Sequence, residues 1–222
     1  TADAAIAQIE KVFGDWEAPQ SPIPSLQLPN LTPAPQQLKI TQPTQQSIIM
    51  LGYLAPSVHQ AEYLALKLLS THLGNGLSSR LFVELREKLG LAYEVSAFYP
   101  TRMSPATFVA YIGTAPENTA IALARLRAEV ELLSQLQLSI EDLQTAKNKL
   151  LGQYALGKQT NGQMAQVYGW YEILGLGIDF DPQFQQAIAQ VSAEAAQQAA
   201  SRYLLEPYIS IVGPEAVVSG NG

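Results

Sequence analysis

The feature that most constrains the fold is a proline-dense segment between residues 16 and 35. Proline fixes one backbone torsion and removes an amide donor, so the segment cannot form a helix and favours extended, polyproline-like backbone. Its prolines are Pro19, Pro22, Pro24, Pro29, Pro33 and Pro35. We interpret the segment as an inter-domain linker, because about twenty residues without secondary structure are unusual inside one compact domain; an irregular surface loop is the alternative.

The residues before the linker predict a helix. Apolar side chains recur at helical spacing up to Phe13, and Gly14 can end the helix. No strand precedes this helix for it to pack on, and the features of a signal peptide are missing. We therefore expect residues 1–15 to end a preceding domain, residues 16–35 to be the linker, and residues 36–222 to form a C-terminal domain.

Beyond the linker, the hydrophobic pattern alternates between strands and helices. The strands are expected at residues 37–41, 47–54, 92–99, 106–113 and 208–212. The helices are expected at residues 60–73, 78–89, 116–136, 139–154, 162–176, 182–191 and 193–204. The order predicts an α+β fold, a mainly antiparallel sheet with helices packed on one face. The continuous apolar run at 47–54 predicts a strand buried on both faces.

Composition excludes several classes of function. A hydrophobic share of 47% and a charged share of 14% indicate a globular protein. The net charge of -6, without a basic stripe, argues against nucleic acid as a partner. The absence of cysteine excludes disulfides and thiolate metal sites. No apolar run reaches the roughly 20 residues of a membrane span, so we expect a soluble chain of undetermined compartment.

Histidine is too scarce for a catalytic metal site. The chain has His59 and His72 alone, and a catalytic zinc normally has three protein ligands. The sequence from His59 through Glu62 to Tyr63 looks like a degraded His-x-x-Glu-His motif with tyrosine at the last ligand position. We therefore expect no metal in this chain. For His72, near a helix end, we expect a partly protonated imidazole facing the last carbonyls.

Two further patterns have structural interpretations. Gly74-Asn75-Gly76 precedes Ser78 and Ser79, and exposed amides at such a helix start can bind an anion. The segment lacks the lysine of a phosphate loop, so a turn with positive φ followed by a serine cap is favoured. The serines have no histidine and carboxylate arranged with them as in a serine hydrolase.

The segment 73–97, LGNGLSSRLFVELREKLGLAYEVSA, resembles the most recognisable part of one family's C-terminal domain. The family is that of pitrilysin, insulin-degrading enzyme and mitochondrial processing peptidase, which are zinc metallopeptidases. The sequence from Phe13 to Trp16 and the segment 139–150 are also similar to it, so the resemblance covers essentially the whole chain. It implies the non-zinc-binding half of a two-half enzyme that closes around an unfolded peptide.

The resemblance also implies two site residues, Arg86 and Tyr93. They match in type, spacing and flanking sequence an arginine and a tyrosine that reach the substrate from the C-terminal half. A guanidinium offers forked donors to a peptide carbonyl or carboxylate, and a phenol can donate to a developing oxyanion. The alternatives are that Arg86 pairs with Glu84 or Glu87 on a helix surface, and that Tyr93 is a packed strand aromatic.

The sequence thus predicts a substrate-binding half-enzyme that is inactive alone. Zinc belongs to the complete enzyme, held upstream on the same natural chain or by a partner subunit, and the substrate is a peptide. The alternative is an inactive scaffold or peptide-binding relative of the same fold. Whether two chains form a dimer stays open.

Overall fold

The computed structural model describes residues 1–17, 19–22 and 31–215, which fall into two compact units. The units comprise Thr1–Asn30 and Leu31–Gly222. Residues 18 and 23–30 of the predicted linker lie outside the described part, and the division into domains at residues 15 and 35 stays a prediction.

The first unit holds the expected N-terminal helix, α1 (Ala2–Phe13). Its start is capped by the Thr1 hydroxyl, which accepts a hydrogen bond from the Ala4 amide at 3.4 Å. The rings of Phe13 and Trp16 meet edge to face, with centroids 4.9 Å apart.

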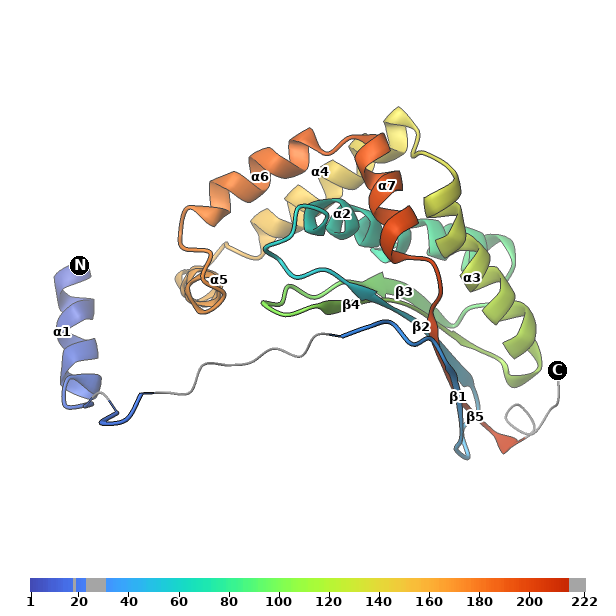
Figure 1. The fold of residues 1–222 in the computed structure, drawn as a ribbon, viewed down its shortest axis with the longest axis horizontal. Coiled ribbons are helices and arrows are strands. Elements are labelled where there is room, and N and C mark those ends of the chain that lie inside the picture. The colour runs from blue at the N-terminus through green and yellow to red at the C-terminus, as the bar shows by residue number, and fades with distance from the viewer. Residues whose placement is uncertain (18, 23–30, 216–222) are drawn as a thin grey trace. The chain divides into compact units, whose positions relative to one another are not determined.

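The second unit is built on a five-stranded sheet with the order β1-β5-β2-β4-β3. The strands are β1 (Gln37–Thr41), β2 (Ser47–Ala55), β3 (Glu94–Phe98), β4 (Ala106–Thr114) and β5 (Tyr208–Gly213). β1 pairs with β5 in parallel, and the other pairs are antiparallel. The first and last strands of the unit therefore lie side by side, and the expected hairpin joins β3 to β4 (Figure 1).

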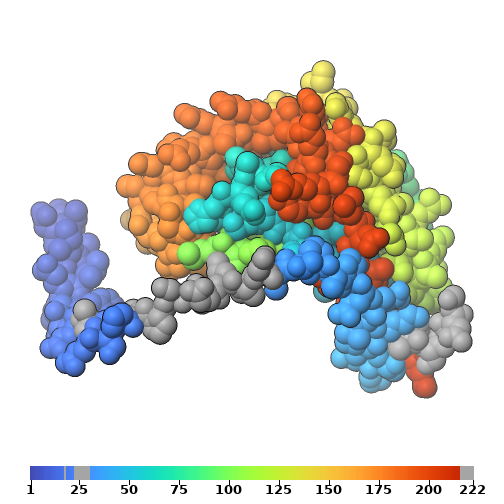
Figure 2. Space-filling view, in the orientation of Figure 1, coloured from blue at the N-terminus to red at the C-terminus, as the bar shows by residue number. Residues whose placement is uncertain are grey.

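Helices cover one face of this sheet (Figure 1). They are α2 (Tyr63–Gly74), α3 (Thr119–Gln135), α4 (Ile140–Leu156), α5 (Asn161–Ile173), α6 (Phe180–Gln190) and α7 (Ala193–Tyr203). Side chains of α2, in cyan in Figure 2, are flanked by those of α6 and α7 in orange and red. The predicted α+β class is confirmed.

Two short helical segments complete the unit. A 3₁₀ turn, η2 (Pro116–Asn118), leads into α3. Most of the helix expected at 78–89 is a π-helix, η1 (Phe82–Lys88), whose wider turn the sequence pattern did not indicate. Single π turns inside helices are frequent at functional sites.

The expectation that β2 is buried on both faces is wrong. Its alternate residues Ile49, Leu51 and Tyr53 are at most 1% exposed and face the helices. On the opposite face Met50 is 41% exposed. An antiparallel sheet needs cover on one face only, so an uninterrupted apolar run does not imply burial on both.

Capping follows the sequence at one helix and departs from it at another. The Ser139 hydroxyl accepts a hydrogen bond from the Asp142 amide at 3.0 Å and caps the start of α4, where the helix expected at 139–154 begins. Gly76 has the expected positive φ of 77°. Ser79 does not act as a cap: its buried hydroxyl has no hydrogen-bond partner among the described residues. Ser78 accepts from Lys149 Nζ at 3.1 Å instead.

A membrane-spanning helix is not found in the part of the chain that the structure describes, where each helix is too short or too polar for that role.

Candidate functional site

The two predicted site residues flank the turn between η1 and β3. Arg86 lies in η1, and Tyr93 directly precedes β3. Gly90 lies in the turn with a φ of 63°, a conformation that favours glycine because it has no Cβ. The turn is anchored from the core by the Thr114 hydroxyl, which donates to the Leu91 carbonyl at 2.7 Å.

The structure brings Arg86 and Tyr93 into direct contact. Arg86 Nη1 donates to the Tyr93 carbonyl oxygen at 2.7 Å. The Tyr93 amide donates to the Gly113 carbonyl of β4 at 2.9 Å. Both main-chain polar groups of Tyr93 are therefore held, while the residue is 60% exposed. The phenol projects from a fixed backbone, so Tyr93 is not the packed strand aromatic of the alternative interpretation.

The surroundings of Arg86 leave its charge available. Glu84 pairs with Lys88 at 2.7 Å, one helical turn away, and no carboxylate within 4.0 Å of Arg86 is found among the described residues. The guanidinium carbon lies 5.2 Å from the centre of the Phe82 ring, a cation–π distance. Since one donor binds Tyr93, the remaining N–H groups can bind another acceptor.

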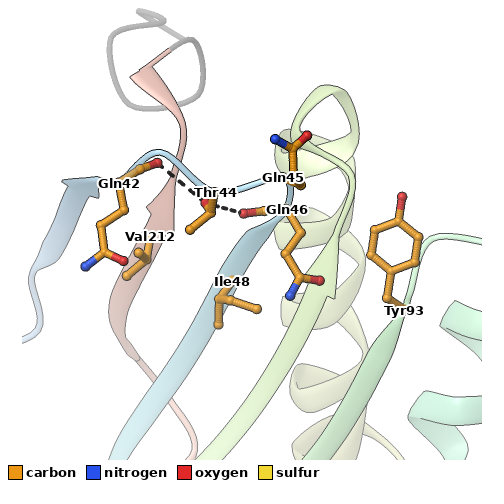
Figure 3. Close-up of a pocket in the computed structure, with 7 residues that line it drawn as sticks. All are labelled: Gln42, Thr44, Gln45, Gln46, Ile48, Tyr93 and Val212. Carbon is orange, nitrogen blue, oxygen red and sulfur yellow. Dashed lines mark hydrogen bonds between the residues drawn. The ribbon is translucent and has the colours of Figure 1, made fainter.

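A cavity of about 510 Å³ adjoins Tyr93 at this end of the sheet (Figure 3). Its other walls come from the loop between β1 and β2 and from the helix-free face of β2 and β5. The lining residues are Gln42, Thr44, Gln45, Gln46, Ile48, Tyr93 and Val212. In Figure 3 the Tyr93 ring stands beside the side chains of Gln45 and Gln46.

The polar loop was not singled out from the sequence. Within the loop, the Thr44 hydroxyl donates to the Gln46 carbonyl at 2.8 Å. The main-chain amide of Gln42 ties the loop to β5 by donating to the Gly213 carbonyl at 2.8 Å. The segment Gln42–Gln46 reads as an ordinary polar turn between strands. Its position next to Tyr93, far along the chain, comes from strand pairing alone.

The residues that the structure describes do not fit a zinc ion. The described residues contain no group of three or more His, Cys, Asp or Glu side chains that could hold a metal. His59 is exposed in the turn before α2. Glu62, the acidic residue of the degraded motif, forms an ion pair with Arg202 instead.

The expectation for His72 also needs correction. It lies in the last turn of α2, as predicted. Burial is the main cause that lowers the pKa of His72, with Arg80 and Lys149 adding to it against the raising effect of Asp142. Because desolvation disfavours the charged imidazolium, burial favours the neutral form of His72 over the expected partly protonated one.

Comparison with protein families identifies the class of this chain. Residues 1–150 match the family model described as the peptidase M16 inactive domain. The chain therefore belongs to the peptidase M16 inactive-domain family, which confirms the resemblance seen in residues 73–97.

Curated relatives carry the description "uncharacterized zinc protease". One from Streptomyces coelicolor is 30% identical over 173 residues, covering 77% of this chain and 38% of the relative. Another, from Bacillus subtilis, is 26% identical over 166 residues, covering 74% of this chain and 40% of the relative. The chain thus spans about two fifths of the length of these curated relatives.

Solved structures show the same fold. A peptidase M16 inactive domain from Pseudomonas fluorescens superposes with a TM-score of 0.82 at 22% identity, covering 96% of this chain and 50% of that one. A protease from Helicobacter pylori gives a TM-score of 0.84 at 18% identity, covering 96% and 53%.

Proposed function

We propose that this chain is the substrate-binding, non-catalytic half of a zinc metalloendopeptidase. In this proposal another domain or a partner subunit would hold the zinc, which would supply the activation for attack on the peptide bond there. The part of this chain is to bind the peptide and to stabilise charge that develops during the reaction.

The observation that carries the proposal is the contact between Arg86 and the main chain of Tyr93. A donor contributes most to catalysis when its position is set before the reaction begins. Arg86 holds the Tyr93 carbonyl at 2.7 Å and the Gly113 carbonyl holds the Tyr93 amide at 2.9 Å, so the exposed phenol projects from a main chain whose position is fixed. The phenol can then donate to the oxyanion of the attacked peptide carbonyl.

Arg86 has two roles in this proposal. Its Nη1 positions Tyr93, and its remaining donors bind a carbonyl or carboxylate of the peptide. The side-chain amides of Gln45 and Gln46 line the cavity beside Tyr93. An amide can both donate to and accept from a peptide backbone, so this cavity suits an extended peptide without demanding particular side chains.

The experiment measures peptide cleavage in the enzyme reconstituted with its zinc-carrying domain or subunit. Arg86→Ala and Tyr93→Phe should each lower kcat/KM roughly tenfold or more, about 1.4 kcal/mol of lost transition-state stabilisation. For Tyr93→Phe the loss should fall on kcat, because the ring and its packing remain and the donor alone is removed.

Arg125→Ala and Tyr203→Phe are matched controls. Arg125 is exposed on α3 and Tyr203 lies at the end of α7, and neither lines the cavity beside Tyr93. Both should leave kcat/KM unchanged. Unchanged kinetics in the Arg86 and Tyr93 variants would instead support an inactive scaffold of the same fold.

A further inference from the structure

A second cavity lies within the helical layer, apart from Arg86 and Tyr93. Its volume is about 760 Å³, within the range of small-molecule sites, and it shares no lining residue with the cavity beside Tyr93. The walls come from α2, α4, α5, α6 and the loop between β3 and β4. The helices α4, α5 and α6 follow one another at one end of the layer (Figure 1).

The cavity has an aromatic wall of linked rings. Tyr154 and Phe184 lie 4.6 Å apart between centroids, and Tyr171 meets Phe180 edge to face at 5.0 Å. The hydroxyls of Tyr154 and Tyr171 are hydrogen-bonded to each other. Because these rings are already ordered by their contacts with one another, binding of an apolar or aromatic group would cost little side-chain entropy.

One side chain lining the cavity carries a formal charge at neutral pH, that of Lys67 on α2. Its ammonium donates to the Tyr99 carbonyl at 2.6 Å and has no carboxylate within 4.0 Å among the described residues. The neighbouring cation Lys158 differs, because it forms an ion pair with Asp181. An ammonium has three donors, so Lys67 can still bind an acceptor in the cavity.

Burial lowers the pKa of Lys67, which means that its charge is poorly solvated. Buried charges in proteins are normally paired with an opposite charge. Lys67 is half-buried and has no carboxylate partner among the described residues, so an anionic ligand could pair with it. The exposed amide side chains of Gln163 and Gln166 stand at the same cavity and offer neutral polar contacts.

We propose that this cavity binds a carboxylate attached to an aromatic or bulky apolar group. The carboxylate pairs with Lys67, and the apolar group packs on the rings of Tyr154, Phe180 and Phe184. Such a ligand is either a small aromatic acid or the C-terminal residue of a peptide, which present the same chemistry. The inference does not depend on the role proposed for Arg86 and Tyr93.

Isothermal titration calorimetry of the full chain tests the proposal with N-acetyl-L-phenylalanine and its amide. The acid should bind at least roughly tenfold more tightly than the amide, because the amide cannot form a charge-assisted hydrogen bond with Lys67. N-acetyl-L-alanine, which retains the carboxylate but lacks the ring, should bind more weakly than N-acetyl-L-phenylalanine.

Variants identify the site. Lys67→Met should remove the preference for the acid over the amide, and Val167→Trp should weaken both ligands by filling the cavity from α5. Lys147→Met is the matched control: Lys147 is a buried lysine that likewise donates to a main-chain carbonyl, that of Ala189 at 2.8 Å, but it does not line the cavity. It should leave binding unchanged.

The comparison of acid and amide uses the wild-type chain, so it tests the proposal even if Lys67→Met does not fold. Absence of binding up to about 10 mM acid, or equal binding of acid and amide, would overturn the proposal. A peptide ending in phenylalanine that binds more tightly than the N-acetyl acid would identify a peptide C-terminus as the source. If N-acetyl-L-phenylalanine binds and the peptide does not, the source is a small acid.

Discussion

Among single residues, Gly74 shows most clearly how a side chain is excluded by tertiary contact. It is the last residue of α2, where the helix passes over β3. A Cβ at this position would lie 1.8 Å from the Ala97 amide nitrogen, well inside the contact distance. The Ser96 hydroxyl donates to the Gly74 carbonyl at 2.7 Å and links β3 to the end of α2 at the same point. Glycine is required here by the approach of two backbones.

Substituting Gly74 should therefore be costly. Gly74→Ala is expected to lower the free energy of unfolding by about 2–3 kcal/mol, because α2 or β3 must shift to admit the methyl group. Urea denaturation measures the change. Gly152→Ala, in the interior of α4 with nothing within 4 Å of the new Cβ, should raise the free energy of unfolding by about 0.5–1 kcal/mol. Equal effects at both sites would contradict the close crossing.

For whole elements, strand β2 decides how the sheet is buried. It pairs with β4 on one side and β5 on the other, so it lies at the centre of the sheet. Its helix-facing residues contribute to the core with α2 and α3, while its other face is partly open. Central position in a sheet and burial on both faces are thus separate properties.

The two faces of β2 should differ in their tolerance of substitution. Leu51→Ala is expected to lower the free energy of unfolding by about 3 kcal/mol, because a fully buried side chain is lost and a cavity remains. Met50→Ala, one residue away and 41% exposed, should cost less than about 1 kcal/mol. Chemical denaturation compares the two, and similar losses would mean that both faces are covered in solution.

At the scale of the whole molecule, the unit Leu31–Gly222 has helices on one face of its sheet and an apolar surface on the other. Leu38, Ile40, Met50 and Phe98 are between 40% and 56% exposed, and strand register puts them on the face that the helices leave open. The cavity beside Tyr93 opens at the end of this same face, whereas the cavity at Lys67 lies in the helical layer. The two candidate sites are therefore independent parts of one domain.

Zinc should have no part in the stability of this chain. The described residues contain no group of three metal ligands, and the sequence has no cysteine. A chelator should leave Tm unchanged, and metal analysis after dialysis against zinc should find far less than one equivalent. A tightly bound equivalent that disappears in His59→Ala would contradict this account and restore His59 and Glu62 as ligands.

The sequence by itself determined the type and order of the helices and strands, the family, and the spacing of Arg86 and Tyr93. These properties are local, since they follow from hydrophobic periodicity, proline and a motif within 25 or so residues. Only the tertiary structure decided which face of β2 is covered, that Arg86 holds the Tyr93 carbonyl, and that Gln45 and Gln46 lie beside the phenol. It alone also gathered Lys67 and the aromatic rings of α4, α5 and α6 around one cavity. Such contacts join residues far apart along the chain, and strand pairing and helix packing, which no local pattern encodes, bring them together.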